Sequence, residues 1–196
     1  YQRGQYFLNR QSGIDAEKAV EYFRKAISID SAYAPAHSGL ASALCLKGWF
    51  NVASVREMHP KARCAINRAL QLDEHLAEAH VALAYIKMNY EWDGDGAYLD
   101  LLRALDLDPG NALAYRCIAG LMAVRANFPD AIAHIEKAYE RDPTSFSISI
   151  PRAWIYYLAG QYEDVVNACN EILELDPNLI RARSLLGLAH EQLDNG

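Results

Sequence analysis

Histidines, the side chains best suited to proton transfer and metal binding, are spread along this chain without any catalytic spacing. The sequence has no His-Glu-x-x-His pair, no Gly-x-Ser-x-Gly turn and no glycine-rich phosphate loop. The six histidines are His37, His59, His75, His80, His134 and His190. We therefore predict that the chain is not an enzyme and that it holds no cofactor and no metal.

The four cysteines are also far apart, and no Cys-x-x-Cys pair is present. Each lies in an apolar stretch with helical spacing, where a free thiol behaves as a small buried hydrophobe. They are Cys45, Cys64, Cys117 and Cys169. This usage favours a reducing compartment, and we predict a cytoplasmic location.

One acidic segment could hold calcium. Residues 91–96 read Glu-Trp-Asp-Gly-Asp-Gly, and oxygens at alternate positions followed by glycine resemble the opening of a calcium loop. Such a loop needs a bidentate glutamate at its twelfth position, where this chain has Leu102. We favour a capped turn at the start of a helix.

Composition excludes two further classes of partner. The net charge is −6, whereas a nucleic-acid-binding domain needs a basic face. No apolar run approaches the roughly 18–20 residues that span a bilayer, so we expect no membrane insertion by this segment. The chain begins at Tyr1 without a methionine and stops at Gly196 inside a repeat. We interpret it as a piece of a longer protein, which could itself be membrane-anchored.

The helical stretches that carry these histidines and cysteines repeat along the chain with a period near 34 residues. Five aspartates each close a stretch with helical spacing: Asp30, Asp73, Asp108, Asp142 and Asp176. Two alanine columns keep the same spacing: Ala19, Ala62, Ala97 and Ala131, then Ala26, Ala69, Ala104 and Ala138. Because helix axes approach closely only where the contacting side chains are small, these columns predict stacked helical hairpins.

The repeat resembles the tetratricopeptide repeat, W-x2-L-G-x2-Y…A-x3-F…P. The leucine slot holds Leu40, Leu83, Ile118 and Leu186, and the small slot after it holds Ala41, Ala84, Ala119, Ala153 and Gly187. The terminal proline is Pro109, Pro143 or Pro177. The aromatic slot departs from the pattern, with His37, His80, Tyr115, Ser149 and Arg183.

This resemblance implies an all-α fold, an α-α superhelix (solenoid) of about five helix-turn-helix repeats plus a final helix. We expect a single domain over residues 1–196. Its repeats would cover about 1–30, 31–73, 74–108, 109–142 and 143–176, with a lone helix at 177–193.

Three repeats break the pattern. The third repeat has one inserted residue, within residues 91–96. The second has nine extra residues around Gly48–Ala53, followed by a capping-box pattern from Ser54 to Glu57. Its Trp49 and Phe50 could contact a partner, but we favour packing between helices. In the fifth repeat, Pro151 suggests a late helix start near Ser149. Arg152 occupies the leucine slot there, so its charge must reach solvent or a carboxylate, through a widened groove or an ion pair.

The resemblance also implies a function. In tetratricopeptide domains the first helices of the hairpins line a concave groove that takes peptides, which predicts a non-catalytic protein–protein interaction module. Aromatic, methionine and arginine residues tend to dominate such interfaces. The predicted partner-binding residues are Tyr85, Met88, Asn89, Arg116, Trp154, Tyr157 and Arg181. Packing between hairpins is an equal alternative for Trp154 and Tyr157.

Particular segments resemble bacterial regulators in which such an array follows a winged-helix DNA-binding domain, a class III nucleotide cyclase or a protein kinase. These segments are Tyr1–Arg10, Gly48–Phe50, Glu91–Asp93 and Leu179–Gln192. The resemblance implies the sensory or regulatory part of a signalling or transcription-regulating protein. The alternative is a structural scaffold. Such a scaffold would either self-associate, for example as a homodimer, or support an enzyme domain in cis.

Overall fold

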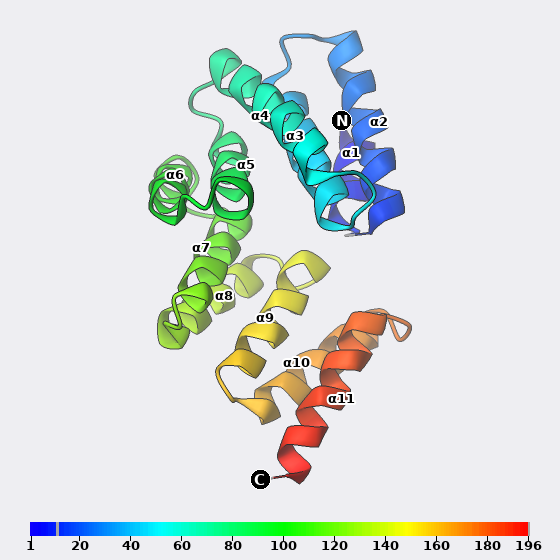
Figure 1. The fold of residues 1–196 in the computed structure, drawn as a ribbon, viewed down its shortest axis with the longest axis vertical. Coiled ribbons are helices and arrows are strands. Elements are labelled where there is room, and N and C mark those ends of the chain that lie inside the picture. The colour runs from blue at the N-terminus through cyan, green and yellow to red at the C-terminus, as the bar shows by residue number, and fades with distance from the viewer. Residues whose placement is uncertain (11, 196) are drawn as a thin grey trace. The chain divides into compact units, whose positions relative to one another are not determined.

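The computed structural model describes residues 1–10 and 12–195, which form helices joined by short turns (Figure 1). The first helices are α1 (Gln2–Asn9), α2 (Gly13–Ile29), α3 (Ala34–Trp49), α4 (Val55–Leu72), α5 (Ala77–Ile86), the π-helical turn η1 (Lys87–Glu91) and α6 (Gly94–Leu107). The remaining helices are α7 (Ala112–Val124), α8 (Phe128–Arg141), α9 (Phe146–Leu158), α10 (Tyr162–Leu175) and α11 (Ile180–Asp194).

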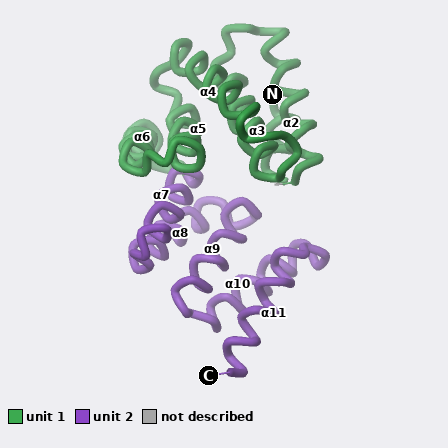
Figure 2. The backbone as a smooth tube through the Cα atoms, viewed as in Figure 1, with its two compact units in different colours: residues 1–111 green, residues 112–196 purple. Residues whose placement is uncertain are grey.

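The chain forms two compact units, residues 1–111 and residues 112–196 (Figure 2). Within each unit, consecutive helices pair as hairpins, such as α3 with α4 and α7 with α8. The first helix of one hairpin also contacts the first helix of the next, as α3 contacts α5 and α9 contacts α7 and α11. Stacked hairpins of this kind form an all-α solenoid, which confirms the predicted fold class.

The aspartate column ends the second helix of each hairpin, and each of the five is the C-cap residue of its helix. Four of these carboxylates accept a hydrogen bond from the backbone N–H two residues ahead, at 2.9–3.0 Å. This Asx turn replaces the helical bonding that stops there. The column therefore marks where the chain turns toward the next hairpin.

The alanine columns form the contact stripe of the second helices. Ala131 and Ala138 are fully buried, and Ile135 between them is also fully buried. The same order of small, large and small occurs in α4 and α6. In α10 the corresponding residues are Val165, Cys169 and Ile172, which are likewise buried. The side-chain volume is therefore divided differently among the three positions, but the buried stripe of the helix is kept.

The insertion after α3 differs from the favoured interpretation. Trp49 is 62% exposed, so it does not fill the joint between helices. Its neighbours Phe50 and Val52 lie close to Gly13, where an added side chain would collide with Val52 and contact Phe50, although Val52 is itself 38% exposed. Ser54 is the N-cap of α4 as predicted, but its side chain makes no capping hydrogen bond, and Glu57 bonds to Lys61 instead.

The extra residue of the third repeat is absorbed as the π-helical turn η1 at the end of α5. Trp92 then takes a left-handed conformation, with φ of 57°. Asp93 begins α6 by accepting a hydrogen bond from the Gly96 N–H at 2.8 Å. The acidic segment is therefore a capped turn, in agreement with the sequence interpretation.

Candidate functional site

Helix α9 carries the two predicted aromatic residues Trp154 and Tyr157, and its first turn corrects the sequence analysis. The helix begins at Phe146, ahead of the predicted start near Ser149, and runs through Pro151. Pro151 has no N–H to donate to the fourth residue before it. Ser149 adds a bond in this turn, since its hydroxyl donates to the Ser145 carbonyl at 3.0 Å.

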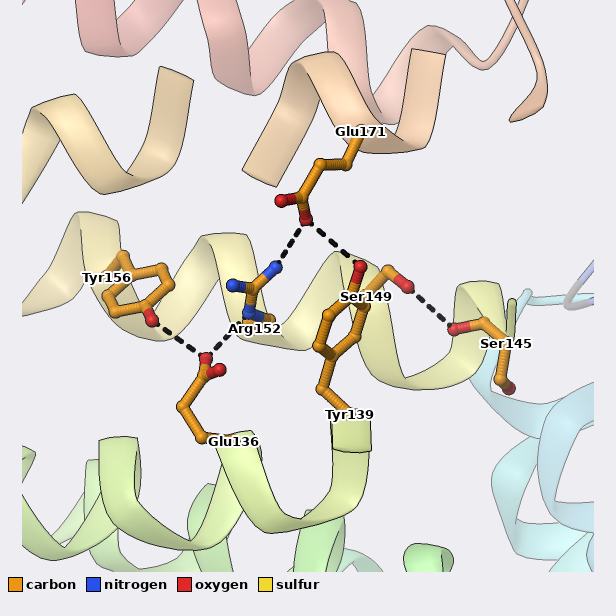
Figure 3. A network of polar contacts seen from close by, with 7 residues as sticks. All are labelled: Glu136, Tyr139, Ser145, Ser149, Arg152, Tyr156 and Glu171. Carbon is orange, nitrogen blue, oxygen red and sulfur yellow. Dashed lines mark hydrogen bonds and ion pairs between the residues drawn. The ribbon is translucent and has the colours of Figure 1, made fainter. Parts of the chain in front are cut away.

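Arg152 forms an ion pair rather than widening a groove. Its Nε atom lies 2.6 Å from Glu136 of α8, and its Nη1 atom lies 2.7 Å from Glu171 of α10 (Figure 3). The side chain is only 13% exposed. A charge in the leucine slot is therefore tolerated because two carboxylates from neighbouring helices replace its water.

Two tyrosines complete this group, which we call the Arg152 network. The hydroxyl of Tyr156 donates to Glu136 at 2.7 Å, and the hydroxyl of Tyr139 donates to Glu171 at 3.1 Å (Figure 3). Burial and the hydrogen bond to Glu136 raise the pKa of Tyr156 to about 12. Burial alone would lower the pKa of Arg152, but its bonds to the two glutamates raise that pKa above its ordinary value.

The Arg152 network fixes which face of α9 is turned outward. At about 100° per residue, Arg152 and Tyr156 share one face, and Trp154 and Leu158 lie on the opposite one. Trp154 is 45% exposed, and Leu158 is similarly exposed. A buried polar group on one side of the helix thus holds an apolar stripe toward solvent on the other.

Trp154 and Tyr157 are brought together by this arrangement. Their rings stack with centroids 5.5 Å apart and planes 15° apart. Tyr157 also meets the ring of Tyr162 edge-on, at 5.7 Å. The three rings form a partly exposed aromatic platform, a surface suited to apolar or cationic side chains.

The two predicted arginines of the second unit lie on the helices that contact α9. Arg116 of α7 is half-buried, and its Nη2 atom lies 3.3 Å from the Cys117 sulfur. Its Nε atom is buried and has no hydrogen-bond partner within the described residues. Arg181 is exposed on α11. The structure places both arginines on first helices of the second unit.

The remaining three predicted residues belong to the first unit. Tyr85, Met88 and Asn89 are half-buried on α5 and η1. Asn89 donates to the Tyr85 carbonyl at 2.9 Å, and Tyr85 packs against the core of this unit. Asn89 thus contributes to the π-helical turn and Tyr85 to the core, and the exposed aromatic residues of this unit include Trp49 and Trp92.

Sequence reasoning missed most of the Arg152 network. Glu136, Tyr139, Tyr156 and Glu171 occupy ordinary helical positions, so nothing in their spacing reveals their convergence. The usable signal was the charge in a slot that is normally apolar.

Among the described residues, no group of His, Cys, Asp and Glu side chains could hold a metal ion. None of the helices in the described part of the chain is long and apolar enough to cross a membrane.

Two family models match this chain, and both are described as tetratricopeptide repeats. One matches residues 125–189 and the other matches residues 15–33. No curated protein sequence matches the chain.

Solved structures share the fold. A chain of the Cut9–Hcn1 hetero-tetramer of the APC/C is 16% identical with a TM-score of 0.70, over 97% of this chain and 39% of that one. A thermophilic tetratricopeptide-repeat protein of Thermus thermophilus is 18% identical with a TM-score of 0.68, over 96% and 99%. YrrB, a tetratricopeptide-repeat protein with an unusual peptide-binding site, is 19% identical with a TM-score of 0.54, over 87% and 82%.

The present chain therefore spans well under half of the Cut9–Hcn1 chain that it matches. At these identities the likeness shows the fold alone. Tetratricopeptide repeats generally mediate protein–protein interaction or bind peptides, and neither matched model describes a catalytic family. The repeat columns, the family models that match residues 15–33 and 125–189, and the shared fold all support a tetratricopeptide-repeat domain.

Proposed function

We propose that the second unit binds a peptide or protein segment on the outward face of α7, α9 and α11. The observation that carries this proposal is the stacked pair of Trp154 and Tyr157, held outward by the buried network on the opposite face of α9. Large aromatic residues are usually buried, so a stacked pair with an exposed Trp154 and a half-buried Tyr157 is a candidate binding surface. The peptide-binding site named for YrrB supports this class of partner.

Arginine side chains flank this surface in the proposal. Arg116 on α7 and Arg181 on α11 supply donors for carboxylates or carbonyl oxygens of the bound segment. Exposed Leu113 and Leu188 lie on the same two helices and extend the apolar area. Tyr85, Met88 and Asn89 are proposed as further contacts on the first unit, by analogy of position.

The test is selection from a displayed peptide library, followed by titration of the best binder into Trp154→Ala combined with Arg116→Ala. Affinity should fall at least about tenfold, the usual loss at an interface hot spot. Helicity and the melting temperature should change little, because Trp154 is half exposed. Arg183→Ala serves as a matched control. Arg183 is exposed on α11, but it fills the aromatic slot of the repeat and is not one of the predicted partner-binding residues. A collapse of the melting transition would reassign the two side chains to the core.

We further propose that residues 1–196 act as one domain in the regulatory part of a longer bacterial signalling or transcription-regulating protein. The support is the resemblance of its terminal and inserted segments to such regulators. The free cysteines support a reducing, cytoplasmic setting. The complete reading frame would test this by showing which effector domain, if any, accompanies the array. A tight, concentration-dependent dimer in light scattering would favour the scaffold role instead.

A further inference from the structure

Basic side chains of α8 surround one tyrosine of α7 in the second unit. The Lys137 Nζ atom lies 5.7 Å from the centroid of the Tyr115 ring, and the guanidinium carbon of Arg141 lies 5.6 Å from it. The imidazole of His134 stacks on the same ring, with centroids 6.0 Å apart and planes 26° apart. We call these four residues the Tyr115 cluster. Two cations and an imidazole thus converge on a single ring.

The three basic residues of the Tyr115 cluster lie on one stripe of α8. At about 100° per residue, positions 134, 137 and 141 fall within about 60° of one another around the helix. Lys137 and Arg141 are both exposed, and they lie one turn apart. The cations are carried by a second helix, whereas the face proposed above belongs to the first helices α7, α9 and α11. The cluster is therefore a separate feature of the unit.

The two cations of the cluster are not neutralised by the part of the chain that the structure describes. No acidic side chain within it forms an ion pair with Lys137 or Arg141. Like charges one turn apart on a helix repel each other. The arrangement is therefore unfavourable by itself, and a bound anion would relieve it.

The acidic side chains of α8 and of its C-cap leave this positive charge in place. Asp130, Glu136 and Asp142 each accept a hydrogen bond from another side chain of the unit. Glu140 lies about 60° around the helix from Lys137, on the neighbouring face. The positive charge of the cluster therefore stays available to a ligand.

The other two members of the cluster add neutral donors. Burial and the charge of Lys137 lower the pKa of the His134 imidazole, against a smaller opposite effect of Asp130. The ring is therefore mostly neutral at neutral pH and carries one N–H. Its Nδ1 atom is buried and has no hydrogen-bond partner among the described residues. The hydroxyl of Tyr115 supplies a further donor.

We propose that the Tyr115 cluster binds a phosphate monoester, with Lys137 and Arg141 on its oxygens. Such a group carries a charge of about −1.5 to −2 at neutral pH, so it matches two unpaired cations, whereas a carboxylate matches only one. The guanidinium holds two oxygens at once, and the flexible ammonium closes on a third. Attraction to the face of Tyr115 keeps both cations near one ring, which reduces the ordering that binding requires.

The experiment is isothermal titration of the whole chain, in buffer free of phosphate, with the peptide acetyl-Ala-Ala-phosphoserine-Ala-Ala-amide. We expect saturable binding with a Kd on the order of 0.1–1 mM. Lys137→Gln combined with Arg141→Gln should weaken binding at least about tenfold, because both charge-assisted contacts are lost. The same peptide with glutamate in place of phosphoserine should bind at least about fivefold more weakly, because it carries less charge.

Arg3→Gln combined with Lys18→Gln is the matched control. These cations also lie over aromatic rings, at 5.9 Å from the centroid of Tyr22 and 5.1 Å from that of Phe7. Their removal changes the net charge by the same amount, but they lie over two different rings of the first unit. This variant should bind the phosphopeptide like the parent. Circular dichroism checks that both double variants remain folded.

Glycerol 1-phosphate, titrated in the same way, distinguishes the sources of the phosphate group. Tighter binding of the phosphopeptide assigns the cluster to a phosphorylated protein segment, and equal or tighter binding of glycerol 1-phosphate assigns it to a small phosphate ester. The proposal is overturned if the folded parent binds neither ligand at millimolar concentration, or if the glutamate peptide binds equally well. An equal loss of affinity in the control variant also overturns it, since binding would then follow net charge alone.

Discussion

The guanidinium carbon of Arg152 lies 4.1 Å from the centroid of the Tyr139 ring, so one cation serves two carboxylates and an aromatic face. Removing it leaves Glu136 without its counterion in a partly buried site. Arg152→Ala should therefore destabilise the second unit by about 2–4 kcal/mol. Glu171→Gln should cost less than about 1 kcal/mol, because Glu171 is half exposed. Urea unfolding of both variants tests this order, and equal losses would contradict it.

Substitution of glycine by alanine should change the stability of the protein in opposite directions at two positions. A Cβ atom at Gly39 would collide with the buried ring of Phe23, whereas nothing lies within 4 Å of one at Gly120. Gly39→Ala should destabilise the fold by about 1–3 kcal/mol. Gly120→Ala should stabilise it by about 0.5–1 kcal/mol, since alanine favours the helix. Paired denaturant titrations measure both, and a destabilised Gly120→Ala would mean that the site is tighter than it looks.

Trp154 should behave as a surface residue in folding. Trp154→Ala is expected to lower the free energy of unfolding by less than about 1.5 kcal/mol, because the indole is half exposed. Ile148→Ala in the same helix should cost about 2–5 kcal/mol, since that side chain is fully buried. Thermal unfolding of the two variants separates a binding surface from a core.

Stability should fall on the alkaline side. The pKa of Tyr156 rises to about 12 in the fold, above about 10 in an unfolded chain. A pKa raised by folding stabilises the protein fully below about pH 10, and this contribution disappears as the pH rises from about 10 toward about 12. Burial raises the pKa of Cys45 to about 12 in the same direction. Tyr156→Phe should flatten the decline of the urea midpoint between about pH 9 and pH 12 without abolishing it, and an unchanged slope would contradict this.

Thiol reactivity should single out one cysteine. Cys64 is exposed, and the other three cysteines are buried. Burial also raises the pKa of Cys169 to about 11, so this side chain stays in the protonated thiol form, which is unreactive. Native protein should therefore react with a disulfide reagent at one site, and Cys64→Ser should remove that reaction. Rapid reaction of a second thiol would show local opening of the core.

Features that follow local rules were predictable from the sequence. Asp108 ends its helix, and its carboxylate accepts a hydrogen bond from the backbone N–H two residues later. Both features depend only on residues that are close in sequence. Ala131 and Ile135 are buried because their spacing defines one helical stripe. The fold class and the family followed from such columns, and the structure and comparisons confirm both.

Features that depend on distant residues were not predictable. Trp49 is exposed while Phe50 and Val52 approach Gly13, an arrangement of segments far apart in the sequence that the sequence does not reveal. Likewise, an ion pair and a widened groove were equally compatible with Arg152 until Glu136 and Glu171 were placed. The assignment of Tyr85, Met88, Asn89, Arg116, Trp154, Tyr157 and Arg181 to partner binding stays a prediction.

The π-helical turn Lys87–Glu91 has a consequence for how the repeats vary. It takes up one additional residue inside the helix, so that Ala97, Leu101 and Ala104 of α6 still reach the core in their usual order. A single-codon insertion is thereby confined to this one turn, with no change of phase downstream. Arrays built in this way can gain a new side chain at a turn in one step, which makes their edges easier to diversify than their packed faces.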